Sequence, residues 1–322
     1  MEDLKAYSER IERGLAAMDF PSSPNGLYDP LRYFLSIGGK RIRPILTLLG
    51  ARLFNCSEST VLSQALAIEV FHNFTLIHDD IMDAAPLRRN QQTVHEKWNQ
   101  DTAILSGDVL LIKAYQLLGN IDPQYLPESF ALFNETGVKV CEGQQMDMDF
   151  EGDSNVSIDQ YIEMIRLKTS VLLGCALELG AISAEASQDD RKALYDFGQH
   201  IGIAFQIQDD ILDLYADPDK FGKQVGGDVI ANKKTLLYLT ALKNATLEQK
   251  EQLRQLENEQ DLELKIARTR QVFDLLDVKL KCQERMAEHY EIALSSLDSL
   301  TVPEEMKQPL LSLASYLMQR DQ

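Results

Sequence analysis

The sequence predicts an all-α protein. Apolar residues recur at helical spacing along almost the whole chain, and turn-forming residues separate these stretches. No run of note has the β-branched alternation of a strand, and the sequence has no GxGxxG, no Walker loop and no HExxH motif. We therefore expect a helix content far above the ~30–35% of an average globular protein.

Composition places the chain among ordinary globular proteins. Of its 322 residues, 44% are hydrophobic and 25% are charged. No Pro/Gly/Ser-rich linker or low-complexity tract divides it, so residues 1–322 are expected to form a single domain. The formal net charge of −18 argues against nucleic acid and against an anionic membrane surface as partners.

The sequence also limits the cellular compartment in which we expect the protein. The first ten residues, MEDLKAYSER, have neither the basic start nor the apolar core of a signal peptide. We expect no membrane span, since no stretch approaches the ~18 consecutive apolar residues that one needs. The four cysteines are scattered and form no CxxC pair, which favours a reducing, cytoplasmic location without disulfides or zinc.

Glycine and proline residues along the chain mark where the expected helices begin and end. Residues 2–18 have an amphipathic pattern, the proline-rich stretch 20–30 reads as a loop, and Pro44 suits the first turn of a new helix. Glycines at 38 and 39 interrupt the helix before it. The expected helices cover 2–18, 31–37, 44–54, 58–83, 94–119, 124–149, 158–183, 188–214 and, with turns near 244–247 and at Pro303, most of the chain from 234.

An acidic motif ends the helix at 58–83. The sequence HDDIMD places Asp79 and Asp83 four residues apart, on one helix face, after an almost entirely apolar run. Two carboxylates held that close repel each other unless a cation lies between them. Oxygen ligands without nearby His or Cys suit Mg²⁺, which takes a few carboxylates together with water and substrate phosphates.

The motif recurs in the second half of the chain as FQIQDDILD, with Asp209 and Asp213 at the same spacing. A single acidic pair of this kind is more often a solvated helix face. Two copies, each behind an apolar stretch and each followed by basic residues, favour a two-sided magnesium clamp on a diphosphate. The two motifs are expected to meet through the fold.

Basic residues gather in short segments near these motifs. GGKRIRP holds Lys40 and Arg43 at an expected helix start, which is a favourable anion site or else a solvated loop. Arg88 and Arg89 follow the first motif, where paired guanidiniums suit diphosphate oxygens. His72 lies two turns before Asp79 and is either a core residue or a substrate contact.

Further polar residues interrupt apolar helices. Lys168 and Thr169 fall in an apolar stretch, where a buried lysine needs a partner: a departing anion or a structural carboxylate. Asp147, near the end of the expected helix 124–149, either faces the site of the acidic motifs or lies on the surface. Gln206 lies three residues before Asp209, and the glycine-rich, lysine-rich stretch that follows Asp213 has the composition of a lid.

These segments together resemble the trans-isoprenyl diphosphate synthases, or polyprenyl synthetases. The matching pieces, in the order of the family, are GGKRIRP at 38–44, HDDIMD at 78–83, RR at 88–89, LKT at 167–169, FQIQDDILD at 205–213 and GKQVGGDVIANKKT at 222–235. One departure is Asn232, where many members have glycine. The resemblance implies a bundle of antiparallel α-helices around a deep central cavity, in a homodimer.

The resemblance also implies roles for residues. Asp79 and Asp83 would bind two Mg²⁺ ions and Asp209 a third, with Asp213 in support. The remaining assignments are Arg88, Lys168, Lys223 and Lys233 for the allylic diphosphate (dimethylallyl, geranyl or farnesyl), Lys40, Arg43, His72 and Arg89 for isopentenyl diphosphate, and Thr169 and Gln206 for stabilising the carbocation.

Product length is expected to depend on the helix before the first motif. Phe74 lies five residues before Asp79, roughly 7.5 Å along a helix axis, and its neighbour Thr75 is small. By resemblance, one aromatic floor at this depth implies geranylgeranyl diphosphate. Farnesyl diphosphate is the alternative, ahead of longer polyprenyl products and of a class I terpene cyclase. Phe74 pointing into the core or an interface is the structural alternative.

Overall fold

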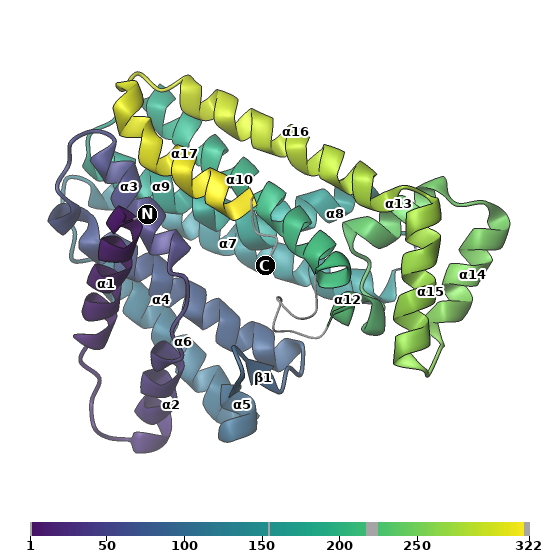
Figure 1. Ribbon diagram of the computed structural model, residues 1–322. Helices are drawn as coiled ribbons and strands as arrows, with labels where there is room; N and C mark the ends of the chain where they lie inside the picture. Colours follow the sequence, from purple (N-terminus) through teal and green to yellow (C-terminus); the bar gives the residue numbers. More distant parts are fainter. Residues whose placement is uncertain (1, 154, 217–224, 319–322) are drawn as a thin grey trace. The chain divides into compact units, whose positions relative to one another are not determined.

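The computed structural model describes residues 2–153, 155–216 and 225–318, and these residues are mostly helical (Figure 1). Their only strands are β1 (Leu87–Arg88) and β2 (Gln91–Gln92), which form a two-residue hairpin. The expectation of an all-α fold is confirmed. The four cysteines are free thiols, as expected.

The chain divides into two compact units, each described here by itself. The first comprises 1–134, 175–192 and 302–306. Its complete elements are α1 (Glu2–Ala16), α2 (Asn25–Ser36), α3 (Ile42–Arg52), α4 (Glu58–Met82), the hairpin, α5 (Val94–Lys97) and α6 (Gln100–Leu118). Parts of α7 (Leu126–Gly152), α9 (Val171–Ser183), α10 (Gln188–Tyr215) and α17 (Glu304–Met318) complete it.

Helix α4 is the core of the first unit. It begins after Ser57, whose hydroxyl caps the first turn, and packs along α3 and α6. By length and composition alone, α4 is long and apolar enough to cross a membrane. However, 61% of its 18-residue apolar stretch is buried within the protein. The polar side chains inside it, such as Glu69 and Asn73, are themselves buried and hydrogen-bonded. α4 thus has the character of a core helix.

The second unit comprises 135–174, 193–301 and 307–322. Its complete elements are α8 (Ile158–Ile165), the π-helical turn η1 (Arg166–Ser170), α12 (Gly227–Ile230), α13 (Leu236–Asn244), α14 (Leu247–Glu257), α15 (Leu262–Leu275) and α16 (Val278–Asp298). Its core joins buried side chains of α8, α10, α13, α15 and α16, among them Ile207, Leu236 and Phe273.

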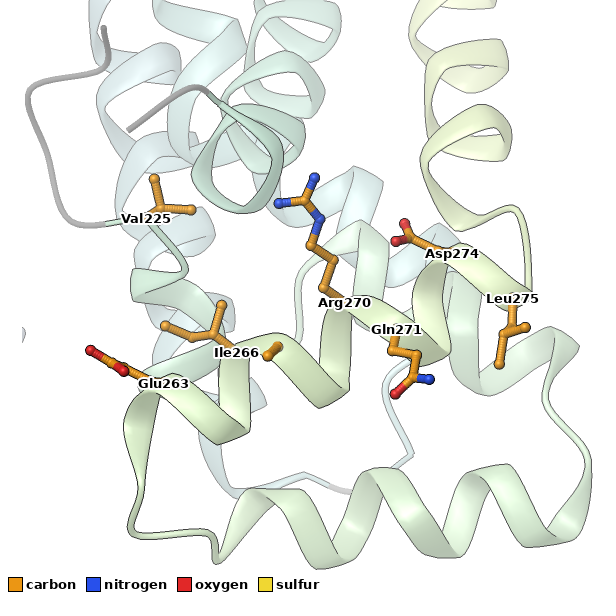
Figure 2. A pocket seen from close by; sticks show the side chains of 8 residues that line it. Val225, Glu263, Ile266, Arg270, Gln271, Asp274 and Leu275 are labelled. Carbon is orange, nitrogen blue, oxygen red and sulfur yellow. The ribbon is translucent and has the colours of Figure 1, made fainter. Parts of the chain in front are cut away.

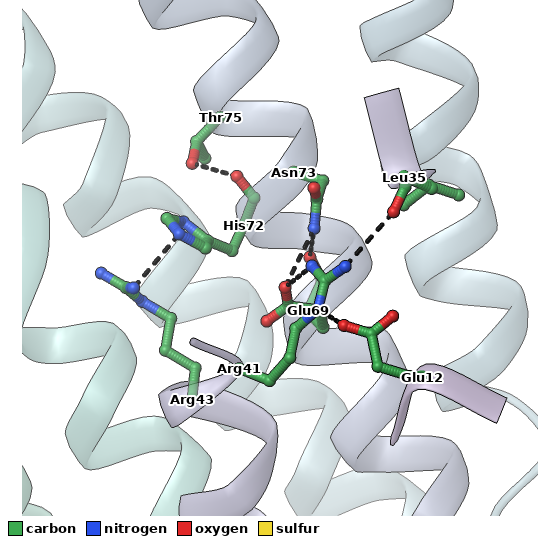
Figure 3. A network of polar contacts seen from close by, with 8 residues as sticks. All are labelled: Glu12, Leu35, Arg41, Arg43, Glu69, His72, Asn73 and Thr75. Atoms are coloured by element: carbon green, nitrogen blue, oxygen red, sulfur yellow. Dashed lines mark hydrogen bonds and ion pairs between the residues drawn. The ribbon is translucent and has the colours of Figure 1, made fainter. Parts of the chain in front are cut away.

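A buried ion pair holds the loop before α3 in place (Figure 3). Arg41, with only 3% of its surface exposed, donates to Glu69 Oε1 of α4 at 2.5 Å and to Glu12 Oε1 of α1 at 2.7 Å. It also donates to the carbonyl of Leu35 at the end of α2. Its backbone is left-handed (φ 52°), which is strained for a non-glycine residue. The side-chain contacts stabilise this conformation and join three helices to the loop.

Three boundaries differ from the sequence-based expectation. α2 begins at Asn25 and contains Pro30, so the stretch expected as a loop up to residue 30 is half helical. Asn99 caps α6 through its side chain, which splits the expected helix 94–119 into α5 and α6. The expected helix 158–183 is continuous but carries η1 in its middle, where one extra residue is accommodated.

We predict that Arg41→Met lowers the free energy of unfolding by about 3–5 kcal/mol, because Glu69, itself 3% exposed, loses its counter-ion. Urea denaturation measures the change. The matched control is Arg254→Met, which removes an exposed ion pair to Glu251 and costs less than about 1 kcal/mol. Equal stability of the two variants would show that the buried pair has no special role.

Candidate active site

The first acidic motif ends α4 with its middle carboxylate turned inward. Asp80 is 1% exposed, and Arg88 Nε donates to its two oxygens at 2.8 and 2.9 Å, with Arg88 Nη2 at 2.7 Å from Oδ1. Asp79 is half-buried and Asp83 is exposed at the C-cap of the helix. The motif therefore presents Asp79 and Asp83 outward and uses Asp80 to hold the arginine expected to bind diphosphate.

The β1–β2 hairpin brings both arginines back to α4. Arg89 and Asn90, the two central residues of its turn, are left-handed (φ 52° and 62°), as a tight two-residue hairpin turn requires. Arg89 lies against Gly39: a Cβ built there would be 2.6 Å from Arg89 Nη1. A side chain at position 39 would displace the guanidinium, so glycine allows Arg89 to approach the GGKRIRP loop this closely.

The residues expected at the second diphosphate come together in the first unit. Arg43 Nη1 lies 3.2 Å from His72 Nε2 (Figure 3). Burial, followed by the charges of Arg43 and Arg89, holds the pKa of His72 well below its usual value, so the neutral ring accepts this hydrogen bond. Lys40, on the same loop, is exposed.

The guanidinium of Arg43 has a hydrogen-bond donor that lacks a partner. Burial lowers its pKa to about 10, with the charge of Glu69 acting in the opposite direction, so it remains protonated at neutral pH. Its Nε is buried with no hydrogen-bond partner. Buried donors normally have one, and an anion beside Arg43 would supply it. The arrangement has the chemistry of an anion site.

The second motif, in the second unit, also turns its middle carboxylate inward. Asp210 is 5% exposed and accepts hydrogen bonds from the Tyr161 hydroxyl (2.5 Å), Gln206 Nε2 (3.3 Å) and the Leu236 N–H (3.4 Å). Burial, then the charge of Asp228, raises its pKa to about 7. Gln206, expected to stabilise a carbocation, is thus tied to the motif through its amide.

Carboxylates concentrate around this motif. The pKa of Asp228 is raised to about 6, first by burial and then by the charges of Asp213, Asp147 and Asp209, while Lys233 lowers it. The N–H of Asp228 donates to Asp213 Oδ2 at 3.0 Å. Such mutual repulsion is relieved by a cation, and oxygen ligands alone suit Mg²⁺.

Sequence reasoning missed Asp228 and left Asp147 undecided. The signal for Asp228 was its place in the lid-like GGD segment, five residues before the lysine pair at 233 and 234. Among the described residues, no group of three or more His, Cys, Asp or Glu side chains is arranged to hold a metal ion by itself. Mg²⁺ usually takes part of its coordination from water and substrate phosphates, so a site for it does not need a full set of protein ligands.

Lys168 projects from η1 and pairs with Asp147 at 2.5 Å. Of the two partners that the sequence allowed, the structural carboxylate is the one observed. α7 approaches η1 closely at Gly143. A Cβ at this position would lie 2.2 Å from the backbone nitrogen of Lys168, so only glycine fits. Thr169 is half-buried beside it and Lys233 is exposed. Lys223 lies outside the described residues.

Phe74 belongs to a row of aromatic rings in the first unit. Its ring lies 5.6 Å from Phe71 and 4.8 Å from His78, and Phe71 in turn lies 5.2 Å from Phe133. Thr75, one position on, hydrogen-bonds the carbonyl of His72. The role of Phe74 as a floor for the product stays a prediction.

The two acidic motifs belong to different units, so a site shared between them also stays a prediction. A separate open pocket of about 900 Å³ lies in the second unit along α15 (Figure 2). Among the described residues, its lining includes none of the expected site residues and a single cation, Arg270, whose guanidinium lies over the Tyr215 ring. We assign the candidate site to the charged clusters because a diphosphate is best held by several cations, whereas Glu263 and Asp274 line this pocket beside Arg270.

Comparisons with known proteins agree with the motifs. The model of the polyprenyl synthetase family matches residues 24–275. The chain is 37% identical to a geranylgeranyl pyrophosphate synthase of Geoglobus acetivorans, over 98% of this chain and 97% of that one. It is 42% identical to a geranylfarnesyl diphosphate synthase of Natronomonas pharaonis, over 68% and 69%.

Solved structures give the same result. A crystal structure of a geranylgeranyl pyrophosphate synthase has a TM-score of 0.94 and 40% identity, covering 98% of both chains. That of a geranylgeranyl pyrophosphate synthase from Corynebacterium glutamicum, complexed with isoprenyl diphosphate and magnesium, has a TM-score of 0.87 and 27% identity, also over 98% of both chains.

The carboxylates predict a pH dependence of the metal-free protein. The raised pKa values mean that the folded state holds protons that the unfolded state releases near pH ~4. The stability that these protons contribute is lost as pH rises through about 6 for Asp228 and about 7 for Asp210. In EDTA, we expect the difference in urea midpoint between the unsubstituted protein and Asp228→Asn to change between pH 5 and pH 8, in favour of the variant at pH 8.

The control for this measurement is Asp189→Asn at the exposed start of α10. It should shift the midpoint equally at both pH values. A midpoint difference for Asp228→Asn that does not depend on pH would contradict the assigned carboxylate cluster.

Proposed function

Because this chain belongs to the polyprenyl synthetase family, we propose that it is a prenyltransferase that condenses isopentenyl diphosphate with allylic diphosphates, head to tail. The main support for the proposal is that the chain has two acidic motifs of the same spacing and, in addition, a separate basic cluster. This cluster consists of Arg43, His72 and Arg89. One diphosphate would be held through the carboxylates and the other by the cations. A protein with a single diphosphate substrate needs no second cluster.

We propose Mg²⁺ as the cofactor, with about three ions at one site. Asp79 and Asp83 would hold two ions, and Asp209, supported by Asp213, the third. The crowded carboxylates around Asp228 fit such ions, and magnesium accompanies isoprenyl diphosphate in the Corynebacterium glutamicum protein. When bound, Mg²⁺ supplies neutralisation of the charge that develops on the departing diphosphate.

The side chains of this protein would do the rest of the first step. Arg88, fixed by Asp80, donates to the allylic diphosphate and stabilises it as it leaves. Lys168 joins it from η1 by exchanging its contact with Asp147 for the phosphate. Lys233, with Lys223 from outside the described residues, would close over the same group.

The second step joins the two substrates. Lys40, Arg43, His72 and Arg89 hold isopentenyl diphosphate, whose alkene attacks the allylic cation. Thr169 and Gln206 stabilise that cation, and apolar walls exclude water, its main competitor. The departed diphosphate accepts the final proton, so no dedicated protein base is required.

We propose geranylgeranyl diphosphate as the product. Phe74 lies on α4, five residues before Asp79, and belongs to a row of aromatic rings, and geranylgeranyl diphosphate synthases are among the similar proteins. Farnesyl diphosphate is the alternative for a shorter cavity and a longer polyprenyl product for a deeper one. A class I terpene cyclase is disfavoured because it has no use for the Arg43 cluster.

A homodimer stays a proposal, and exposed apolar side chains support it. In the first unit, Leu105 and Ile112 of α6 are both 58% exposed and lie seven residues apart, hence on one face of the helix. Phe130 of α7 is 44% exposed. Apolar side chains gathered on one surface are typical of a face that a partner covers.

We predict that Asp79→Ala and Asp209→Ala each reduce prenyl transfer by about a hundredfold or more, since each removes a ligand of the Mg²⁺ that holds the diphosphate and neutralises it as it departs. The assay incubates the protein with Mg²⁺, labelled isopentenyl diphosphate and each allylic diphosphate. Asp189→Ala, an exposed carboxylate of α10, should leave turnover unchanged. Full activity of either Asp79→Ala or Asp209→Ala would contradict the assignment of these aspartates as Mg²⁺ ligands.

We also predict that Phe74→Ala lengthens the main product beyond twenty carbons, because removing the ring deepens the cavity below Asp79. Chromatography of the dephosphorylated products measures chain length. Tyr316→Ala, which removes an exposed aromatic ring of α17 outside this row, is the control and should leave the length unchanged. An unaltered product from Phe74→Ala would mean that the floor lies elsewhere.

A further inference from the structure

A polar pocket in the second unit has a lining that the proposed reaction does not use. It has a volume of about 200 Å³ and lies between α8, α13 and α16. Three of its lining residues are cations: Lys243 from α13, and Lys281 and Arg285 from α16. No carboxylate is among the described residues that line it. In a chain of net charge −18, three cations that line one pocket without a carboxylate among its described lining residues require an explanation.

The contacts of these cations leave much of their hydrogen-bonding capacity unused. Lys281 Nζ donates to the carbonyl of Leu276 at 2.7 Å, which satisfies one of its three donors and none of its charge. Arg285 lies 3.3 Å from Glu288 in a pair that is largely exposed on both sides, so this pair is weak. Lys243 is exposed.

Neutral groups of the pocket add donors. Thr240 is 6% exposed, and its hydroxyl accepts from Cys282 Sγ, so its own proton can be directed to another acceptor. The wall thus combines ammonium, guanidinium and hydroxyl donors.

We propose that this pocket binds a phosphoryl anion, either free diphosphate or the diphosphate head of an isoprenoid. Phosphoryl oxygens carry several charges and accept from Lys and Arg at once. The volume equals that of roughly seven waters at ~30 Å³ each, which is room for a small anion but not for an acidic peptide. The inference does not rest on the proposed function.

The pocket is also linked to the second acidic motif through α13. Leu236 lines the pocket, and its N–H donates to Asp210 Oδ2. Lys233 lies three residues before it in the sequence. The first residue of α13 therefore contacts both the phosphoryl pocket and the second acidic motif.

Calorimetry tests the site directly. The full chain carrying Arg89→Gln and Lys168→Gln, which weaken anion binding at the candidate active site, is titrated with inorganic diphosphate in EDTA at low ionic strength. Adding Lys281→Gln and Arg285→Gln should weaken the remaining binding about tenfold, as expected for two exposed charge contacts. Glu288→Gln should strengthen it, because Arg285 loses its competitor.

Lys279→Gln is the matched control, since Lys279 lies on α16 but does not line the pocket. It should leave the affinity unchanged. Isopentenyl diphosphate in place of inorganic diphosphate separates the two sources: equal affinity indicates recognition of the diphosphate alone. Unchanged affinity after Lys281→Gln and Arg285→Gln would overturn the proposal.

A second measurement uses the unsubstituted protein. Acetylation of lysines by acetic anhydride, followed by mass spectrometry, reports which ammonium groups the ligand covers. Inorganic diphosphate should slow the labelling of Lys243 and Lys281 and leave that of Lys279 unchanged. Labelling of all three at the same rate with and without diphosphate contradicts the site, whatever the enzyme's activity proves to be.

Discussion

The buried pair of Arg41 and Glu69 is the constraint on which the first half of the site depends. An arginine in a tight, left-handed backbone is strained, and a carboxylate inside an apolar helix is costly on its own. Each removes the penalty of the other, and contacts to α1 and α2 complete the arrangement. The loop is thereby fixed beside α4, which places Arg43 against His72.

The two acidic motifs use their three aspartates in the same way. Two carboxylates of each motif remain outside the core, and the middle one is buried on hydrogen-bond donors. The donors differ: a guanidinium serves Asp80, whereas Asp210 takes a phenol, an amide and a backbone N–H. The same spacing thus produces a charged contact in one unit and a largely neutral one in the other. Burial and the charge of Asp228 raise the pKa of Asp210 to about 7, and its three hydrogen-bond donors only partly oppose this rise.

Several of these features are implicit in the chain. A helix advances about 100° per residue, so Asp79 and Asp83 on one face leave Asp80 pointing elsewhere. The hairpin turn at Arg89 and the π-helical turn at Lys168 were not predicted, because neither has the glycine or proline that normally marks a break. Likewise α2 continues through Pro30, where sequence rules expect a loop. In each case tertiary packing outweighed local preference.

The sequence by itself determined the all-helical class, the two acidic motifs, the basic segments and membership of the polyprenyl synthetase family, because these depend on periodicity and on residues near one another in the chain. Only the tertiary structure decided which charges pair. Arg41 is structural while Arg43, two residues away, keeps an unused donor, and Lys168 is held by Asp147. The physical reason is that a charge is assigned by burial and by distance to partners on other helices, and neither quantity is written in the spacing of the residues.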